Sequence, residues 1–454
     1  MKNRSRLEEF INSPKKSLWK LSLPMMVGMS VQAIYMLIDT AFIGNWVGFK
    51  ALTGLGFVFP PMFIIMGITF GLGSGATTVI AQNIGKEDKK NADSTAEHLL
   101  FIGIFLSTIF ILIGMLYGTS ILEFQGAKNM SLIYASEYFF TMLIGIPFMI
   151  FSIFFRSILS GEGDNMMPMK ILGLGTITNI ILDPVLIYYY QIKGAAIATV
   201  ISQFIVFIIF IYIILVKKSS FISFNLTKFK FDSKILSKIL LIGLPVSFSM
   251  LIMSVGIFFY NSILSNSMYP DSAIAAYTTA HRIEHLFFIP IISIATSMVT
   301  LIGMFYGAKK EKLIKDVIKY SIQSCLFISI IYTLIFYFFA DNIIPVFVKN
   351  SESQQVINIG VSYFKIFAFA VPFIAIGMIG GRVMQGLGKA YPMFILTCLR
   401  VIIISCSLAW YFIEKLNKPL EYAWLAILIS CITSSIISIT WMFIELKKMN
   451  LKNS

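Results

Sequence analysis

Twelve long apolar segments dominate this sequence and restrict its possible folds more than any other feature. About 20 apolar residues in a helix are enough to cross a bilayer. With 57% hydrophobic and only 13% charged residues, the chain is too apolar for a soluble globular enzyme. We therefore expect an all-α integral membrane protein with twelve transmembrane helices. These cover approximately residues 18–44, 52–81, 98–118, 132–157, 169–190, 194–216, 239–264, 273–303, 317–339, 355–381, 393–413 and 421–446.

Lys and Arg residues are unevenly distributed among the loops between these segments. If the N-terminus is cytoplasmic, 27 of the 36 Lys and Arg residues fall on the cytoplasmic side and six on the outer side. Cytoplasmic loops are normally enriched in these residues. We therefore expect a multi-pass protein of the cell inner (plasma) membrane with both termini in the cytoplasm. The formal charge of +14 is spread over loops instead of one patch, so we expect no nucleic-acid partner.

Four short motifs occur twice, at offsets of 221, 225, 225 and 222 residues. They predict an N-terminal six-helix lobe (1–216), a basic cytoplasmic linker (217–238) and a C-terminal six-helix lobe (239–454). Repeated halves with the same orientation are typical of transporters with a cavity between the halves. The pairs are LSLPM at 21–25 with IGLPV at 242–246, IPFMI at 146–150 with VPFIA at 371–375, GEGDNMMPM at 161–169 with GLGKAYPM at 386–393, and GK at 85–86 with GA at 307–308.

The sequence has no motif for nucleotide hydrolysis. The nearest glycine-rich string, GGRVMQGLGKA at 380–390, lacks the leading Gly of a phosphate-binding loop at the required spacing and ends in Ala. We therefore expect no enzymatic activity and no cofactor, with an ion gradient supplying energy. The four cysteines lie in apolar segments without CxxC spacing, so we expect neither a disulfide framework nor a zinc site.

Two acidic residues interrupt the apolar segments of the N-terminal half. Asp39 lies in the first segment and Asp183 in the fifth, with Asn179 one helical turn before Asp183. Counted from the outer helix ends at about 1.5 Å per residue, Asp39, Asp183 and Thr199 lie about 9–12 Å deep. We therefore expect these side chains in one layer of the outer half of this lobe.

Ionisable residues inside a membrane usually mark an ion or substrate pathway. Oxygen ligands of this kind suit a hard cation, and a buried carboxyl can also bind a proton, so protons and sodium are both chemically possible. The alternative is a set of polar residues paired only for packing. On the first helix, Gln32, Tyr35 and Asp39 form one polar stripe, and Pro24 interrupts the backbone hydrogen bonds.

The C-terminal half lacks these carboxylates, since the aligned positions are Tyr260 and Ser407. Cation coupling is therefore expected only in the N-terminal half. Ionisable residues also occur inside the predicted membrane segments of this half. They are Lys365 and those of the string HRIEH at 281–285, namely His281, Arg282, Glu284 and His285. Two histidines at i and i+4 do not complete a metal site. We expect Glu284 to neutralise a nearby cation, either Arg282 or Lys365.

These residues resemble the multidrug and toxin extrusion (MATE) family. The resemblance runs from about residue 18 to residue 445 and rests on four features of the sequence. They are Leu23-Pro24 followed by Gln32, Tyr35 and Asp39; NIILDP at 179–184; GAAIAT at 194–199; and the duplicated GxG…PM loops.

The resemblance implies two six-helix lobes in a V that export amphipathic, often cationic, organic molecules in exchange for protons or sodium. It implies cation binding by Asp39, Asn179, Asp183 and Thr199, without any other metal, and bending of the first helix near Pro24. We assign Gln32, Tyr35, Met36 and Lys365 to the substrate cavity. We expect the protein to act as a monomer.

This chain departs from branches of the family that place acidic residues in the seventh and tenth helices. It has none in the seventh, and Lys365 lies in the tenth. Two alternatives remain at this point. A lipid-linked oligosaccharide or glycolipid flippase of the same superfamily would use a more cationic cavity, and Arg282, Lys365 and Arg400 are compatible with one. A membrane-embedded transferase would need catalytic Asp or His residues in sizeable loops.

The charge distribution predicts the topology directly. In a variant without native cysteines, a cysteine at position 128 should react with an impermeant thiol reagent in intact cells, whereas one at 228 should react only after permeabilisation. Permeabilised cells serve as the control for reactivity at both positions. The reverse labelling pattern would invert the orientation and all depth estimates based on it.

Overall fold

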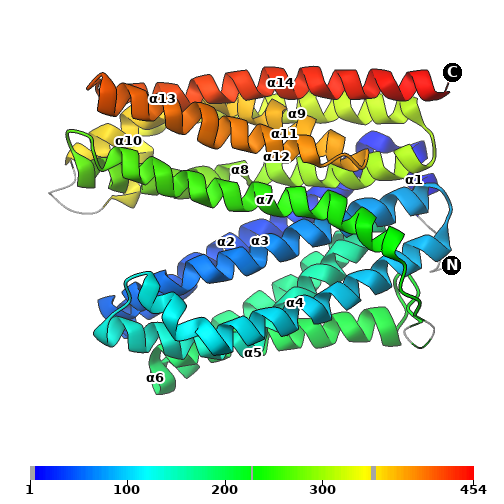
Figure 1. Ribbon diagram of the computed structural model, residues 1–454, viewed down its shortest axis with the longest axis horizontal. Helices are drawn as coiled ribbons and strands as arrows, with labels where there is room; N and C mark the ends of the chain where they lie inside the picture. Colours follow the sequence, from blue (N-terminus) through cyan, green and yellow to red (C-terminus); the bar gives the residue numbers. More distant parts are fainter. Residues whose placement is uncertain (1–5, 226, 228, 349–353, 454) are drawn as a thin grey trace. The chain divides into compact units, whose positions relative to one another are not determined.

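The computed structural model describes residues 6–225, 227, 229–348 and 354–453. Position 228, proposed above for labelling, lies outside these residues. Within the described part, the chain consists of long helices without a strand (Figure 1). The first half contains α1 (Leu7–Asn12), α2 (Pro14–Trp46), α3 (Phe49–Gly85), α4 (Lys89–Phe124), α5 (Asn129–Gly161), α6 (Met166–Ile211) and the π-helical turn η1 (Tyr212–Val216).

The second half begins at α7. Two of its transmembrane segments are divided by short 3-10 or π-helical stretches, namely η4 within the tenth and η5 and η6 within the eleventh. Its elements are α7 (Ser233–Leu264), α8 (Pro270–Gly307), α9 (Glu311–Phe347), α10 (Gln354–Phe367), η4 (Ala368–Ala370), α11 (Val371–Gly386), α12 (Tyr391–Cys398), η5 (Leu399–Cys406), α13 (Ser407–Trp410), η6 (Tyr411–Lys415) and α14 (Glu421–Asn453).

The helices account for all twelve predicted crossings. Ten continuous helical stretches of the described chain are long and apolar enough to span a membrane. One of them, Met166–Val216, contains two predicted crossings because the backbone turns sharply at Gln191. The 33-residue helix α2 contains the first predicted crossing. The prediction of an all-α multi-pass membrane protein with twelve transmembrane segments is therefore confirmed.

The chain packs as two compact units. One consists of Met1–Glu9 and Leu23–Ser247, and the other of Phe10–Ser22 and Phe248–Ser454. Two helices therefore change unit along their length, α2 after Ser22 and α7 after Ser247. Each change lies within two residues of a proline, Pro24 or Pro245. Because these units reflect packing, the predicted division at 217–238 into repeated lobes remains a prediction.

The start of α2 belongs to the second unit through contacts with α9. The indole nitrogen of Trp19 donates a hydrogen bond to the Tyr320 hydroxyl over 2.9 Å. The Lys15 ammonium lies 5.4 Å from the centre of the same tyrosine ring. The tyrosine of α9 thus holds this segment by both a hydrogen bond and a cation–π contact.

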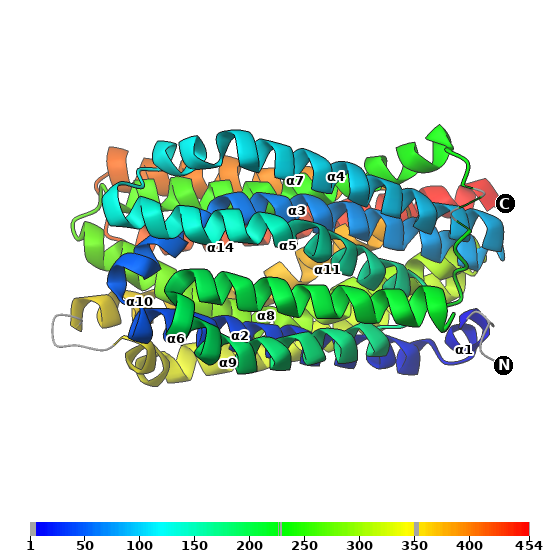
Figure 2. The same ribbon diagram turned by 90° about the horizontal axis from the view of Figure 1, so that it is seen from below.

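Small residues allow close helix packing in the first unit, where α3, α4 and α5 lie side by side (Figures 1 and 2). Gly71 and Gly75 of α3 face the beginning of α7. A Cβ atom at Gly75 would lie 2.7 Å from the backbone nitrogen of Gly243. The Ser247 hydroxyl donates to the Ile68 carbonyl over 3.1 Å. The glycine spacing in the sequence therefore serves packing, as such spacing commonly does in membranes.

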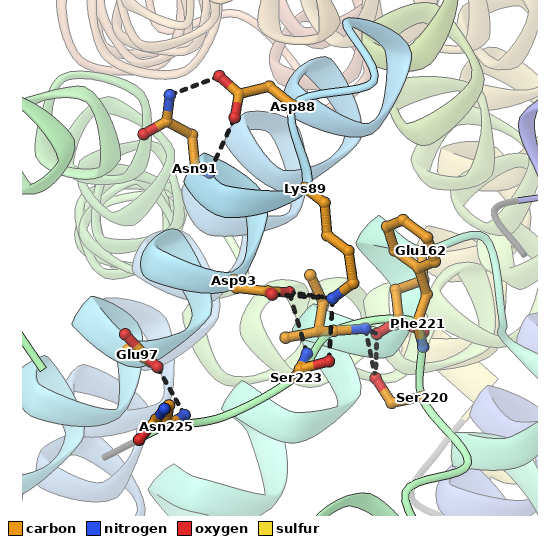
Figure 3. A network of polar contacts seen from close by, with 11 residues as sticks. Asp88, Lys89, Asn91, Asp93, Glu97, Glu162, Ser220, Phe221, Ser223 and Asn225 are labelled. Carbon is orange, nitrogen blue, oxygen red and sulfur yellow. Dashed lines mark hydrogen bonds and ion pairs between the residues drawn. The ribbon is translucent and has the colours of Figure 1, made fainter. Parts of the chain in front are cut away.

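The linker is anchored to the first unit by three carboxylates (Figure 3). Glu162 accepts hydrogen bonds from the backbone nitrogens of Phe221 and Ile222, at 2.9 and 3.0 Å, and from the Ser220 hydroxyl. Asp93 accepts from the Ser223 nitrogen at 2.9 Å. In addition, Glu97 accepts from the Asn225 nitrogen at 2.8 Å. Much of this basic segment is thus a fixed part of the unit.

Glu162 is buried at this junction. Burial raises the pKa of Glu162 above its ordinary value, while the hydrogen bonds from Ser220, Ile222 and Phe221 act in the opposite direction. A buried carboxyl is tolerated only when its oxygens have such partners. The backbone of the linker therefore donates hydrogen bonds to Glu162 that the neighbouring helix α5 does not provide.

The close contact at Gly75 leads to a stability prediction. We expect Gly75→Val to destabilise the protein by about 1–3 kcal/mol, because the added carbons must displace backbone atoms of α7. Gly56→Val is the matched control, since nothing lies within 4 Å of a Cβ at this position in the same helix. Thermal unfolding of the purified proteins in detergent measures both effects. Equal unfolding temperatures for the two variants would contradict the packing role.

Candidate functional site

A sharp turn in α6 brings two of the predicted site residues to the same depth. Gln191 has φ 51° and ψ −133°, so the helix reverses there into two arms. A Cβ at Gly194 would lie 2.0 Å from the Leu186 carbonyl oxygen, so this close approach requires glycine. Asp183 and Thr199 lie eight residues before and after Gln191, which places both about 12 Å from the turn.

The carboxyl groups of Asp39 and Asp183 meet inside the first unit. Asp39 of α2 is 9% exposed and Asp183 of α6 is completely buried. Their side chains interact directly. The amide nitrogen of Asn179 donates to an oxygen of Asp183 over 3.4 Å. Three of the four predicted cation-binding residues thus form one buried cluster from two helices.

Thr199 joins this cluster through two tyrosines. Its hydroxyl donates to the Ala195 carbonyl over 3.0 Å, and it also interacts with the hydroxyl groups of Tyr35 and Tyr138. Tyr35 belongs to the predicted polar stripe of α2. Tyr138 of α5 was not predicted, because one tyrosine among 19 in apolar helices carries no sequence signal of its own.

Three buried oxygen atoms of the cluster have no hydrogen-bond partner among the residues that the structure describes. They are one carboxyl oxygen each of Asp39 and Asp183 and the amide oxygen of Asn179. Buried polar atoms are nearly always paired, so each exception needs an explanation. Such a set of oxygens can hold a proton or a hard cation such as sodium. Among the described residues, no group of three or more His, Cys, Asp and Glu side chains could bind a metal ion.

The residues assigned to the substrate cavity fall in different places. Pro24 and Gln32 line a small cavity between α2, α5 and α6, and Tyr35 belongs to the cluster above. Met36 lies outside the residues whose side chains the structure describes. Lys365 is in the second unit, where its ammonium lies 2.9 Å from a carboxyl oxygen of Asp341. The assignment of Gln32, Tyr35, Met36 and Lys365 to one substrate cavity therefore remains a prediction.

The expected neutralisation of Glu284 by Arg282 or Lys365 is wrong. Glu284 is buried on α8, with one oxygen 3.6 Å from Nδ1 of His281, and it also interacts with the Tyr363 hydroxyl. Arg282 is exposed. The spacing of His281 and Glu284, three residues apart on one helix, permits their contact, whereas the partner of Lys365 lies on another helix, α9, and could not be found from spacing.

Comparison with known proteins is consistent with this arrangement. The probable multidrug resistance protein NorM of Thermotoga maritima is 26% identical over 435 residues, covering 94% of this chain and 92% of NorM. The multidrug export protein MepA of Staphylococcus aureus is 26% identical over 402 residues, 88% of either chain. A solved MOP superfamily transporter from Pyrococcus furiosus is 29% identical, with a TM-score of 0.92 over 96% of this chain and 97% of that one.

The MatE family description matches residues 24–185 and 245–411. These two stretches contain three of the four predicted cation-binding residues, Asp39, Asn179 and Asp183, and one stretch lies in each of the two predicted halves. This match covers most of the chain. The protein therefore belongs to the MatE family of membrane transporters.

Proposed function

We propose that the protein is a secondary active antiporter that exports amphipathic, cationic organic compounds in exchange for protons or sodium. The observation that carries this proposal is the contact between Asp39 and Asp183, together with the three unpartnered oxygens around it. The relatives described above are named as a probable multidrug resistance protein and a multidrug export protein, which favours drug export over the flipping of lipid-linked sugars.

The contact between two carboxyl groups requires a positive partner. Two carboxylates that share a buried site repel each other strongly, so both cannot be ionised unless a proton or a cation lies between them. No Lys or Arg forms an ion pair with either acid in the described part of the chain. The positive partner must therefore come from solution, which makes the pair a site for the coupling ion.

Occupancy of this site affects α2 as a whole. Asp39 and Pro24 lie on the same helix, and proline removes one backbone hydrogen bond where it interrupts the ladder. A cation between Asp39 and Asp183 holds α2 against α6. Its release allows α2 to bend near Pro24 and changes the space beside Gln32 and Tyr35. Each ion thereby favours one of two conformations of the transporter.

The remaining assignments follow from the sequence and the family. We place the protein in the plasma membrane as a monomer with cytoplasmic termini, without a cofactor, and with small organic molecules and the lipid bilayer as its partners. The positive charge of the loops supports this orientation. Negative charge from Asp39 and Asp183 favours cationic substrates, which compete with the coupling ion.

We expect Asp39→Asn and Asp183→Asn each to reduce gradient-driven drug export to less than about a tenth of wild type, because neutral amides cannot bind a proton in this pH range. Export from cells or proteoliposomes at matched protein levels measures this effect. Asp271→Asn is the control, since this acid is exposed in the first turn of α8 in the other unit. Wild-type export by either cluster variant would contradict the coupling role.

Drug and ion should also weaken each other's binding by the same factor. For the wild-type protein, we expect drug affinity to vary with pH or with sodium concentration. This dependence should disappear in Asp39→Asn, whereas Lys365→Ala should shift drug affinity and keep the dependence. Binding to purified protein across pH and sodium concentration identifies the coupling ion. Loss of the dependence in Lys365→Ala, with retention in Asp39→Asn, would assign coupling to the C-terminal half.

A further inference from the structure

A second polar feature of the first unit lies apart from the carboxyl pair. It is a cavity between α2, α5 and α6, lined by Pro24, Gly28, Gln32, Arg156, Asn165 and Met169 among others. Arg156 is the one charged residue among those that line it. It lies five residues before the end of α5, about 7.5 Å inside the helix.

The guanidinium of Arg156 has no carboxylate partner in the described part of the chain. Its recorded neighbour is the ring of Phe70 on α3, 5.6 Å from the ring centre. Arginine inside a membrane is normally paired with an acid or with backbone carbonyls. The positive charge at this cavity is therefore balanced only by an aromatic face.

Both acids of the adjacent turn have other partners. Asp164 lies 2.7 Å from the Arg6 guanidinium and accepts from the backbone nitrogens of Met166 and Met167, each at 3.1 Å. Glu162 accepts the three hydrogen bonds from the linker. Neither carboxyl group can neutralise Arg156 without breaking these contacts.

In the corresponding region of the second unit, the arginine has a side-chain hydrogen-bond acceptor. Arg382 donates a hydrogen bond to the side-chain oxygen of Gln385 over 2.8 Å. When the two GxG motifs are aligned, Ser160 occupies the position of Gln385, and Arg156 lies one position before that of Arg382. The shorter Ser160 side chain donates instead to the Asn165 oxygen over 2.7 Å. The first unit thus has a cavity beside its arginine where the second has an internal acceptor.

We propose that this cavity binds one small inorganic anion, chloride in the cell, against the Arg156 guanidinium. Its volume is about 20 Å³, and a site for a single water needs about 10–15 Å³ by the same measure. A monoatomic halide fits such a space and its single negative charge matches the single guanidinium, whereas sulfate and doubly ionised phosphate carry two negative charges. The anion supplies the missing negative charge and contacts α2 next to Pro24, so it stabilises the packing of α2 on α5 and α6.

The test measures chloride binding without any transport assay, so its result is independent of the proposed antiport. Chloride replaces gluconate at constant ionic strength while the unfolding temperature of the purified protein is recorded. An anion that binds only the native state raises this temperature in a saturable way. We expect such a rise for wild type and for the control Arg382→Met. Bromide should reproduce the effect, and sulfate and phosphate should not.

Two variants address the site itself. Arg156→Met removes the charge, and Ser160→Gln keeps it but supplies an internal acceptor like that of Arg382. We expect at least a tenfold weaker apparent chloride affinity in both. Bromide-soaked crystals should show an anomalous peak at the Arg156 guanidinium in wild type and none in Ser160→Gln. A wild-type unfolding temperature independent of chloride, an unchanged response in Ser160→Gln, or stabilisation by phosphate instead of chloride would each overturn the proposal.

Discussion

The contact between Asp39 and Asp183 is the interaction on which the rest of the first unit depends. Asp183 is buried on the first arm of α6, and the reversal at Gln191 brings Thr199 of the second arm to the same depth. The reversal in turn requires the absence of a side chain at Gly194. Two acids in contact inside a membrane are costly unless a positive ion joins them. The fold thus holds two buried carboxyl groups whose negative charge a proton or cation from solution can neutralise.

The same unit also contains a positive charge without an acidic partner, near the other end of its helices. Arg156 lies beside a small cavity without an acid to pair with it, and the nearby Glu162 and Asp164 are occupied by the linker and by Arg6. Both unbalanced sites touch α2, one at Asp39 and the other next to Pro24. If α2 bends near Pro24 as proposed, the movement would affect the proposed cation site and the proposed anion site together.

Residue counting predicted much of this architecture, because membrane thickness fixes helix length and depth along a helix follows from the rise per residue. Hence the twelve segments and the common layer of Asp39, Asp183 and Thr199 could be predicted. Contacts across helices could not. Tyr138, the pairing of Lys365 with Asp341, and the anchoring of the linker on Glu162 depend on helix rotation and on partners far away in sequence. Helix rotation and contacts between distant residues produce no periodic pattern in a uniformly apolar sequence.

Acids in the two units have different partners whether they are buried, like Glu284, or exposed, like Asp341, and this difference is consistent with the proposal that only the first unit binds a coupling ion. In the second unit, Glu284 lies 3.6 Å from His281, and Asp341 lies 2.9 Å from Lys365. Each of these acids has a basic side chain within the same unit, so its charge can be balanced without an ion from solution. Asp39 and Asp183 have only each other, an amide and hydroxyl groups. A basic residue placed beside them would satisfy the pair permanently and remove any reason for an external cation to bind.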